Sequence, residues 1–128
     1  EFLEDFSGIK EITAGHGFIL EDNQESPLLN ESYYFTRAPR AIVGQKADGS
    51  VVMMTVDGRN AENNMYGVTQ EEMAAICKYY GLVDAYNLDG GGSATFMVRS
   101  GDDFIVTNTP SDGNVRAISN AIFSSSYA

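Results

Sequence analysis

Hydrophobic positions in the middle of the chain follow a helical spacing. Apolar residues recur at i, i+3, i+4 and i+7, which is typical of a helix with one buried face. The residues of this stripe are Met73, Ile76, Cys77 and Tyr80. Thr69 and Glu72 in front of the stripe form a capping-box pattern, and Gly81 behind it is a suitable stop. The sequence therefore predicts one well-defined helix over about residues 70–80, with Cys77 as a core residue.

Short apolar runs elsewhere predict β-strands. The runs are residues 18–20, 41–44, 51–56, 83–88, 94–99, 104–108 and 117–123. Asp48-Gly49 and the polar residues 100–103 lie between neighbouring runs and predict hairpin turns. The pattern favours an α+β fold, in which a mixed, mainly antiparallel sheet carries the one helix on its surface.

Length and hydropathy limit the class of protein. A chain of 128 residues fits a single domain, residues 1–128, with one moderate core. The apolar runs are too short for a spanning helix, and no charged and then apolar leader is visible at Glu1. Residues 1–11 mix acids with apolar residues, which predicts a short amphipathic helix or an irregular lead-in.

Charge and rare residues exclude several functions. A net charge of −10 disfavours nucleic acid and anionic membrane surfaces as partners, because both would be repelled. The single Cys77 excludes an internal disulfide, and the single His16 excludes a site built on several histidines. In so acidic a chain, the positions of the arginines are informative.

The most unusual stretch is Gly90-Gly91-Gly92, which Asp89 precedes and Ser93 and Thr95 follow. Three consecutive glycines are costly to order, so the fold must need a bare backbone there. Successive amides in such a turn can receive an anion. The alternative is a glycine-rich hairpin loop in which Asp89 only forms the turn.

Two other segments have open interpretations. Asp57-Gly58-Arg59 follows a strand and is either an ion-paired turn or part of a site. His16 lies between Gly15 and Gly17, which suggests a close backbone approach at a loop, and an ordinary turn histidine is the alternative.

The order of these motifs resembles the phosphodiester glycosidase domain family over roughly residues 12–123. The matching segments are residues 39–44, 56–59, 67–69, 87–95 and 110–112, together with Arg116 and Asn120. The chain has Ala41 where the family usually has threonine, and Ala94 where a serine is common. An upstream Asn-Gly-Phe-Phe-like segment of the family is not found, so the resemblance implies the C-terminal part of the domain, without its N-terminal portion.

The resemblance implies hydrolysis of a sugar-1-phosphodiester. Asp89 is then the favoured carboxylate for the sugar or the attacking water, and Asp57 is the second candidate. Arg40 and Arg116 are expected to bind the phosphate, with the amides of residues 91–93. The other expected substrate-binding residues are Arg59, Gly91, Gly92, Ser93, Thr95, Ser111, Asp112 and Asn120. Asp112 has an alternative as the first residue of a turn with Gly113.

Three further expectations complete the hypothesis. The competing function is a non-catalytic module that binds phosphorylated glycans on a secreted or surface protein. No cofactor is predicted, although Asp57 and Asp89 could offer oxygen ligands to a divalent cation. The resemblance implies a phosphorylated carbohydrate as substrate, an extracellular, cell-envelope or lumenal setting, and an association with a missing N-terminal segment or a second chain.

Overall fold

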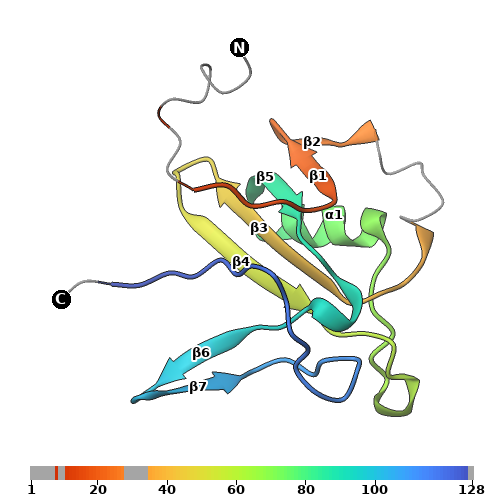
Figure 1. The fold of residues 1–128 in the computed structure, drawn as a ribbon. Coiled ribbons are helices and arrows are strands. Elements are labelled where there is room, and N and C mark those ends of the chain that lie inside the picture. The colour runs from red at the N-terminus through yellow and green to blue at the C-terminus, as the bar shows by residue number, and fades with distance from the viewer. Residues whose placement is uncertain (1–7, 9–10, 28–34, 127–128) are drawn as a thin grey trace.

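The structure is a computed structural model that describes residues 8, 11–27 and 35–126 of the chain (Figure 1). The strands are β1 (Gly17–Glu21), β2 (Gln24–Glu25), β3 (Arg40–Lys46), β4 (Val51–Val56), β5 (Leu82–Asn87), β6 (Met97–Ser100) and β7 (Asp103–Val106). The helical elements are α1 (Gln70–Tyr79) and the short turns η4 (Ala61–Asn63) and η5 (Gly91–Ser93). This is the α+β arrangement that the sequence predicts.

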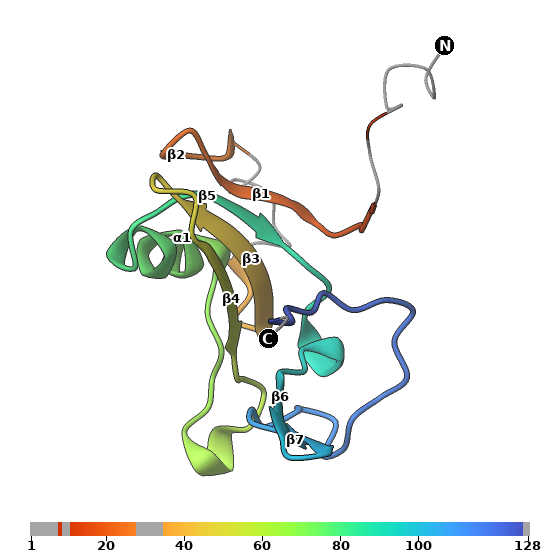
Figure 2. The same ribbon diagram turned by 90° about the vertical axis from the view of Figure 1, so that its left-hand side faces the viewer.

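Two sheets make up the fold. The larger one has five strands in the order β2-β1-β5-β3-β4, and the smaller one is the β6–β7 hairpin. Each pair of neighbouring strands is antiparallel. α1 joins β4 to β5 and lies across one face of the larger sheet, as Figure 2 shows from the side. The expected hairpin at Asp48-Gly49 joins β3 to β4, with Gly49 at φ 87°.

The core lies between α1 and the larger sheet. Its fully buried side chains come from the helix and from the three central strands, and they are Ile19, Leu20, Ile42, Met73, Ala74, Cys77, Leu82 and Ala85. Burial raises the pKa of the Cys77 thiol to about 11, so this residue packs as a small apolar side chain at neutral pH. The predicted core position of Cys77 is therefore confirmed.

The helix begins with the predicted capping box. The amide of Glu72 donates to Thr69 Oγ1 at 3.2 Å, and the amide of Thr69 donates to Glu72 Oε2 at 2.9 Å. Gly81 follows the helix with φ 77°, as a stop residue in the left-handed region should.

Replacing Thr69 by alanine should lower the free energy of unfolding by about 1 kcal/mol, because the Glu72 amide loses its side-chain acceptor. Urea denaturation measures the change. Thr69→Ser keeps the hydroxyl and serves as the control, so an equal loss in both variants would contradict the capping role.

Three local predictions differ from the structure. Residues 117–123 form no strand, and they lie exposed in an extended segment because no described strand edge pairs with their backbone. The strand expected from residue 94 begins only at Met97. Tyr80 is 52% exposed, since the helix ends before it. Most of the lead-in predicted over residues 1–11 lies outside the described residues.

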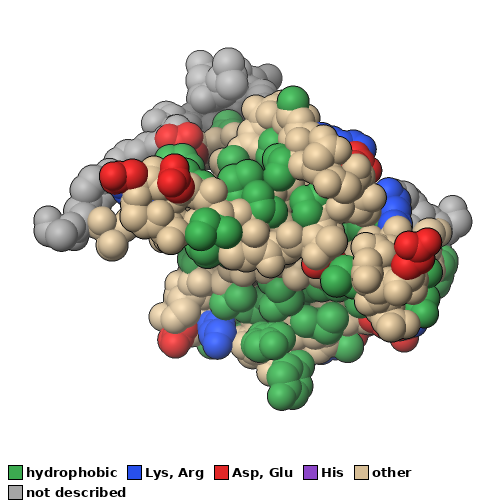
Figure 3. All heavy atoms as spheres, turned by 90° about the horizontal axis from the view of Figure 1, so that it is seen from below, with side chains coloured by type: hydrophobic (Ala, Val, Ile, Leu, Met, Phe, Trp, Pro, Cys, Tyr) green, Lys and Arg blue, Asp and Glu red, His purple; other side chains and the backbone are tan. Residues whose placement is uncertain are grey.

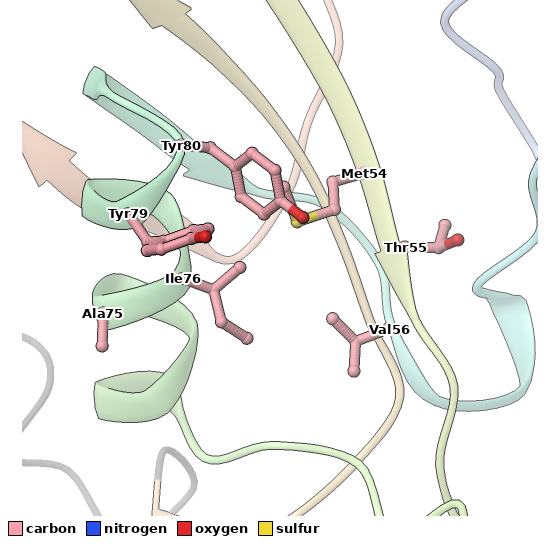
Figure 4. A pocket seen from close by; sticks show the side chains of 7 residues that line it. All are labelled: Met54, Thr55, Val56, Ala75, Ile76, Tyr79 and Tyr80. Carbon is pink, nitrogen blue, oxygen red and sulfur yellow. The ribbon is translucent and has the colours of Figure 1, made fainter.

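Two apolar regions of the surface are exposed to solvent. An apolar hollow of about 600 Å³ lies between β4 and α1, where Met54, Val56, Ile76, Tyr79 and Tyr80 are among its lining residues (Figure 4). Seen from below, the molecule also shows a broad band of apolar side chains (Figure 3). The exposed apolar residues of β6 and β7 are Met97, Val98, Phe104 and Ile105. The hollow has no charged side chain among its lining residues, so it does not suit a phosphate group.

Candidate active site

The glycine turn, residues 90–93, crosses from the larger sheet to the hairpin. The amide of Leu88 donates to Ala41 O at 2.8 Å, and the amide of Gly91 donates to Pro39 O at 3.0 Å. These bonds hold the turn against the start of β3. A Cβ built on Gly90 would lie 2.7 Å from Pro39 O, so this backbone approach requires glycine. The run therefore connects two sheets and is no hairpin loop.

Arg59 lies against one side of the turn. A Cβ built on Gly91 would be 2.9 Å from Arg59 Nη1 and 3.5 Å from the guanidinium carbon. Arg59 itself has φ 56°, a left-handed conformation that is uncommon for a long side chain. The other described non-glycine residues with positive φ are Asp22, Asn23 and Asn64, types that tolerate it. Strain of this kind clusters at functional sites, so Arg59 is a strong candidate for one.

Asp112 lies against the turn at Gly92 and is bonded to Arg116. A Cβ built on Gly92 would be 2.4 Å from both carboxylate oxygens of Asp112. Arg116 Nε donates to Asp112 Oδ2 at 2.9 Å, and Arg116 Nη2 donates to the same oxygen. Asp112 thus lies between Gly92 and the guanidinium of Arg116, while the Gly113 amide closes a turn onto Pro110 O. The second guanidinium of the site is therefore fixed by an acid of the same segment.

Asp89 begins the turn and faces His16. Asp89 Oδ1 lies 3.6 Å from His16 Nε2, and the side chains are 70% and 41% exposed. A carboxylate in this position is accessible to a ligand. His16 was not among the site residues that the sequence predicted, although its flanking glycines were the signal that could have found it.

Among the described residues, three buried polar atoms without a hydrogen-bond partner belong to segments that flank the turn or contact it, and another, Gln70 Oε1, lies in α1. The three are Asn87 Oδ1, Thr95 Oγ1 and Ser111 Oγ. Asn87 and Thr95 flank the turn in sequence, and Ser111 precedes Asp112. Buried polar groups are almost always satisfied in native proteins, so such a group indicates a water or a ligand that completes it.

Both carboxylate oxygens of Asp57 accept hydrogen bonds from the segment that follows β7. The donors are Asn108 Nδ2 at 3.1 Å and the Thr109 amide at 2.8 Å. Asn108 also donates to Ala94 O at 2.9 Å, so Asp57 fixes the connection after the glycine turn. Neither interpretation of Asp57-Gly58-Arg59 foresaw these contacts, and the catalytic role of Asp57 stays a prediction.

Arg40 is 2% exposed and lies at the start of β3. Its Nε donates to Val68 O at 3.2 Å, and its Nη2 donates to Thr36 O at 2.9 Å. These bonds tie the entry of the strand to Val68, just before α1, and to Thr36, just upstream of β3. The contacts are structural, and the expected part of Arg40 in phosphate binding stays a prediction.

Replacing Arg40 by methionine should lower the free energy of unfolding by about 2–4 kcal/mol, because the carbonyls of Val68 and Thr36 lose a buried charged donor. Thermal and urea denaturation measure the loss. Arg99→Met is the matched control, since Arg99 is 70% exposed on β6 and should cost less than about 0.5 kcal/mol. Equal stability of both variants would contradict the bracing role.

The remaining predicted residues lie near the same segments. Ser93 closes the glycine turn by donating its amide to Gly90 O at 3.1 Å, and Asn120 lies in the exposed stretch beyond Arg116. The structure thus brings Arg59 and Asp112 to the turn that follows Asp89, and Arg116 is bonded to Asp112. Arg40 and Asp57 instead bond to backbone and side-chain groups of neighbouring segments. Among the described residues, no group of three or more His, Cys, Asp or Glu side chains could hold a metal ion. No described helix is long and apolar enough to cross a membrane.

The chain is similar in sequence to known proteins. The family model for phosphodiester glycosidases matches residues 3–124. The SPbeta prophage-derived uncharacterized protein YomE of Bacillus subtilis (strain 168) is 39% identical over 80 residues, which are 62% of this chain and 12% of that protein. The N-acetylglucosamine-1-phosphodiester alpha-N-acetylglucosaminidase of Bos taurus is 37% identical over 79 residues, which are 62% of this chain and 14% of that enzyme.

A solved structure shares the fold. It is the zebrafish N-acetylglucosamine-1-phosphodiester alpha-N-acetylglucosaminidase catalytic domain, auto-inhibited by its pro-peptide. The TM-score is 0.60 at 21% identity, over 77% of this chain and 34% of that one. The chain therefore spans 12–14% of the length of these two sequence relatives and about a third of the solved one.

Proposed function

Because the chain belongs to the phosphodiester glycosidase family, we propose that it hydrolyses a sugar-1-phosphodiester at the glycine turn. The reaction breaks the bond between the anomeric carbon and a phosphate oxygen, and water supplies the new hydroxyl group of the sugar. The observation that carries the proposal is the Arg59 guanidinium against Gly91, just after the accessible carboxylate of Asp89. A second guanidinium, that of Arg116, is bonded to the Asp112 carboxylate that lies against Gly92.

These two arginines provide local positive charge in an otherwise acidic chain. With a net charge of −10, the molecule as a whole repels an anionic substrate. A local fork of N–H donors can offset that repulsion, because guanidiniums bind phosphate oxygens bidentately. We assign Arg59 and Arg116 to the phosphate, with the amide of Gly92 as a further donor. The amides of Gly91 and Ser93, which the sequence also predicted as donors, already donate to Pro39 O and Gly90 O.

The chemistry explains why one carboxylate can suffice. Glycosidases generally need an acid to protonate the leaving oxygen and a second carboxylate opposite to it. A phosphate leaving group has a second pKa of about 6, so it departs readily once its charge is matched. Asp89 is then the carboxylate that assists the attack of water on the anomeric carbon. Thr95 and Ser111 offer buried hydroxyl oxygens to the sugar.

Turnover of a chromogenic sugar-1-phosphodiester tests the proposal. We expect equal amounts of sugar and phosphate monoester, and we expect Arg59→Met to lower kcat/KM by about 10- to 100-fold, the effect of losing one charge-assisted bond. Arg99→Met removes an exposed arginine far along β6 and should leave kcat/KM within about two-fold.

Saturable binding of the substrate without formation of product would contradict the enzymatic function and favour the non-catalytic binding module. Turnover that is insensitive to Arg59 would move the phosphate site away from the glycine turn. The extracellular, cell-envelope or lumenal setting, and the association with an N-terminal segment or second chain, stay predictions.

A further inference from the structure

The segment that carries His16 is held closely against the end of β5. β1 and β5 pair in antiparallel register with Gly17 opposite Asn87, and the His16 amide donates to Asn87 O at 2.6 Å. A Cβ built on Gly15 would lie 2.4 Å from the same carbonyl and 2.7 Å from Tyr86 Cε1. Gly17 has φ 107°, which also favours glycine. Both glycines are therefore needed to bring this backbone to the residues before Asp89.

This placement delivers the only histidine of the sequence to the glycine turn. His16 Nε2 lies 3.6 Å from Asp89 Oδ1, and both side chains reach solvent. The pairing of β1 with β5 holds this backbone in place, and the exposed ion pair that it creates contributes little to stability. Imidazole beside a carboxylate is, by contrast, a recurrent arrangement for moving a proton.

We propose that His16 is a catalytic base in the reaction proposed above, with Asp89 as its carboxylate partner. As water attacks the anomeric carbon, one water O–H bond breaks and its proton passes to the imidazole of His16. The water oxygen forms the new bond to carbon, and the bond from carbon to the phosphate oxygen breaks with its electron pair on that oxygen. The proton then leaves to solvent or to the phosphate monoester. Asp89 offsets the charge of the imidazolium and orients the ring.

The inference rests on the proposed function, and its test separates the two. With the full chain and a chromogenic sugar-1-phosphodiester, His16→Gln should lower kcat by about 10²- to 10⁴-fold, with KM within a few-fold of the wild type. His16→Ala should regain part of its rate in added imidazole, because a small base can enter the space. Glu11→Gln, which removes an exposed charge from the same segment, should leave kcat unchanged.

A double variant adds a second readout. Residues that act as one unit have non-additive effects, so His16→Gln combined with Asp89→Asn should be about as slow as Asp89→Asn alone. Wild-type turnover with an unchanged kcat in His16→Gln, or a loss that imidazole does not restore and that adds fully to Asp89→Asn, overturns the role of His16 while the proposed function stands. Absence of turnover in the wild-type chain overturns the proposed function, and the role of His16 with it.

Discussion

Asparagine in place of Asp89 is expected to lower kcat for a sugar-1-phosphodiester by about 10³-fold while the fold stays intact. The carboxylate is 70% exposed, and its described partner is His16 at 3.6 Å, so its removal should change the free energy of unfolding by less than about 0.5 kcal/mol. The loss in rate comes from a charge that is needed only as the bond to phosphate breaks. Steady-state kinetics and a urea denaturation curve measure the two quantities on one sample.

Asp102→Asn is the matched control for this variant. Asp102 is fully exposed in the turn between β6 and β7, so kcat should not change. A kcat within about three-fold of the wild type in Asp89→Asn would remove Asp89 from the chemistry.

Alanine in place of Gly92 should raise KM for the same substrate by at least about ten-fold and cost little stability. The new methyl group would lie 2.4 Å from both oxygens of Asp112, so that side chain must move. Arg116 bonds to Asp112 through Nε and Nη2, and it would lose its position with it. Because the displaced atoms are the end of a side chain near the surface, the backbone need not shift.

Kinetics together with thermal denaturation test this expectation. Gly8→Ala adds a methyl group with no atom of another described residue within 4 Å, and it should change neither KM nor Tm. An unchanged KM in Gly92→Ala would show that Asp112 and Arg116 do not bind the substrate.

Local features of the fold could be predicted from the sequence because short-range chemistry determines them. The capping box at Thr69, the stop at Gly81 and the hairpin at Asp48-Gly49 each depend on a few neighbouring residues, and the structure confirms all three. The strand predicted over residues 117–123 is wrong because it depends on more than neighbouring residues. The composition of this segment suits a strand, but a strand also needs a partner edge, which no local pattern supplies.

The site depends on contacts that local patterns do not encode. His16 meets Asp89 only because β1 pairs with β5 with Gly17 opposite Asn87, a register set across the whole sheet. In the sequence, Arg40 and Arg59 have similar neighbours, since each lies beside the end of a predicted strand. Their difference lies in the backbone, because Arg40 bonds to the carbonyls of Val68 and Thr36 whereas a left-handed φ places Arg59 against Gly91.

The central claim is that a sugar phosphate binds at the glycine turn, and an NMR titration of the ¹⁵N-labelled chain with a sugar 1-phosphate tests it most directly. The account predicts the largest amide shifts at Gly91, Gly92 and Ser93, and an affinity at least about ten-fold weaker in Arg59→Met. The account would be contradicted if the amide signals of the glycine turn did not shift and the largest shifts occurred instead at Ile76, Tyr79 and Tyr80 beside the apolar hollow.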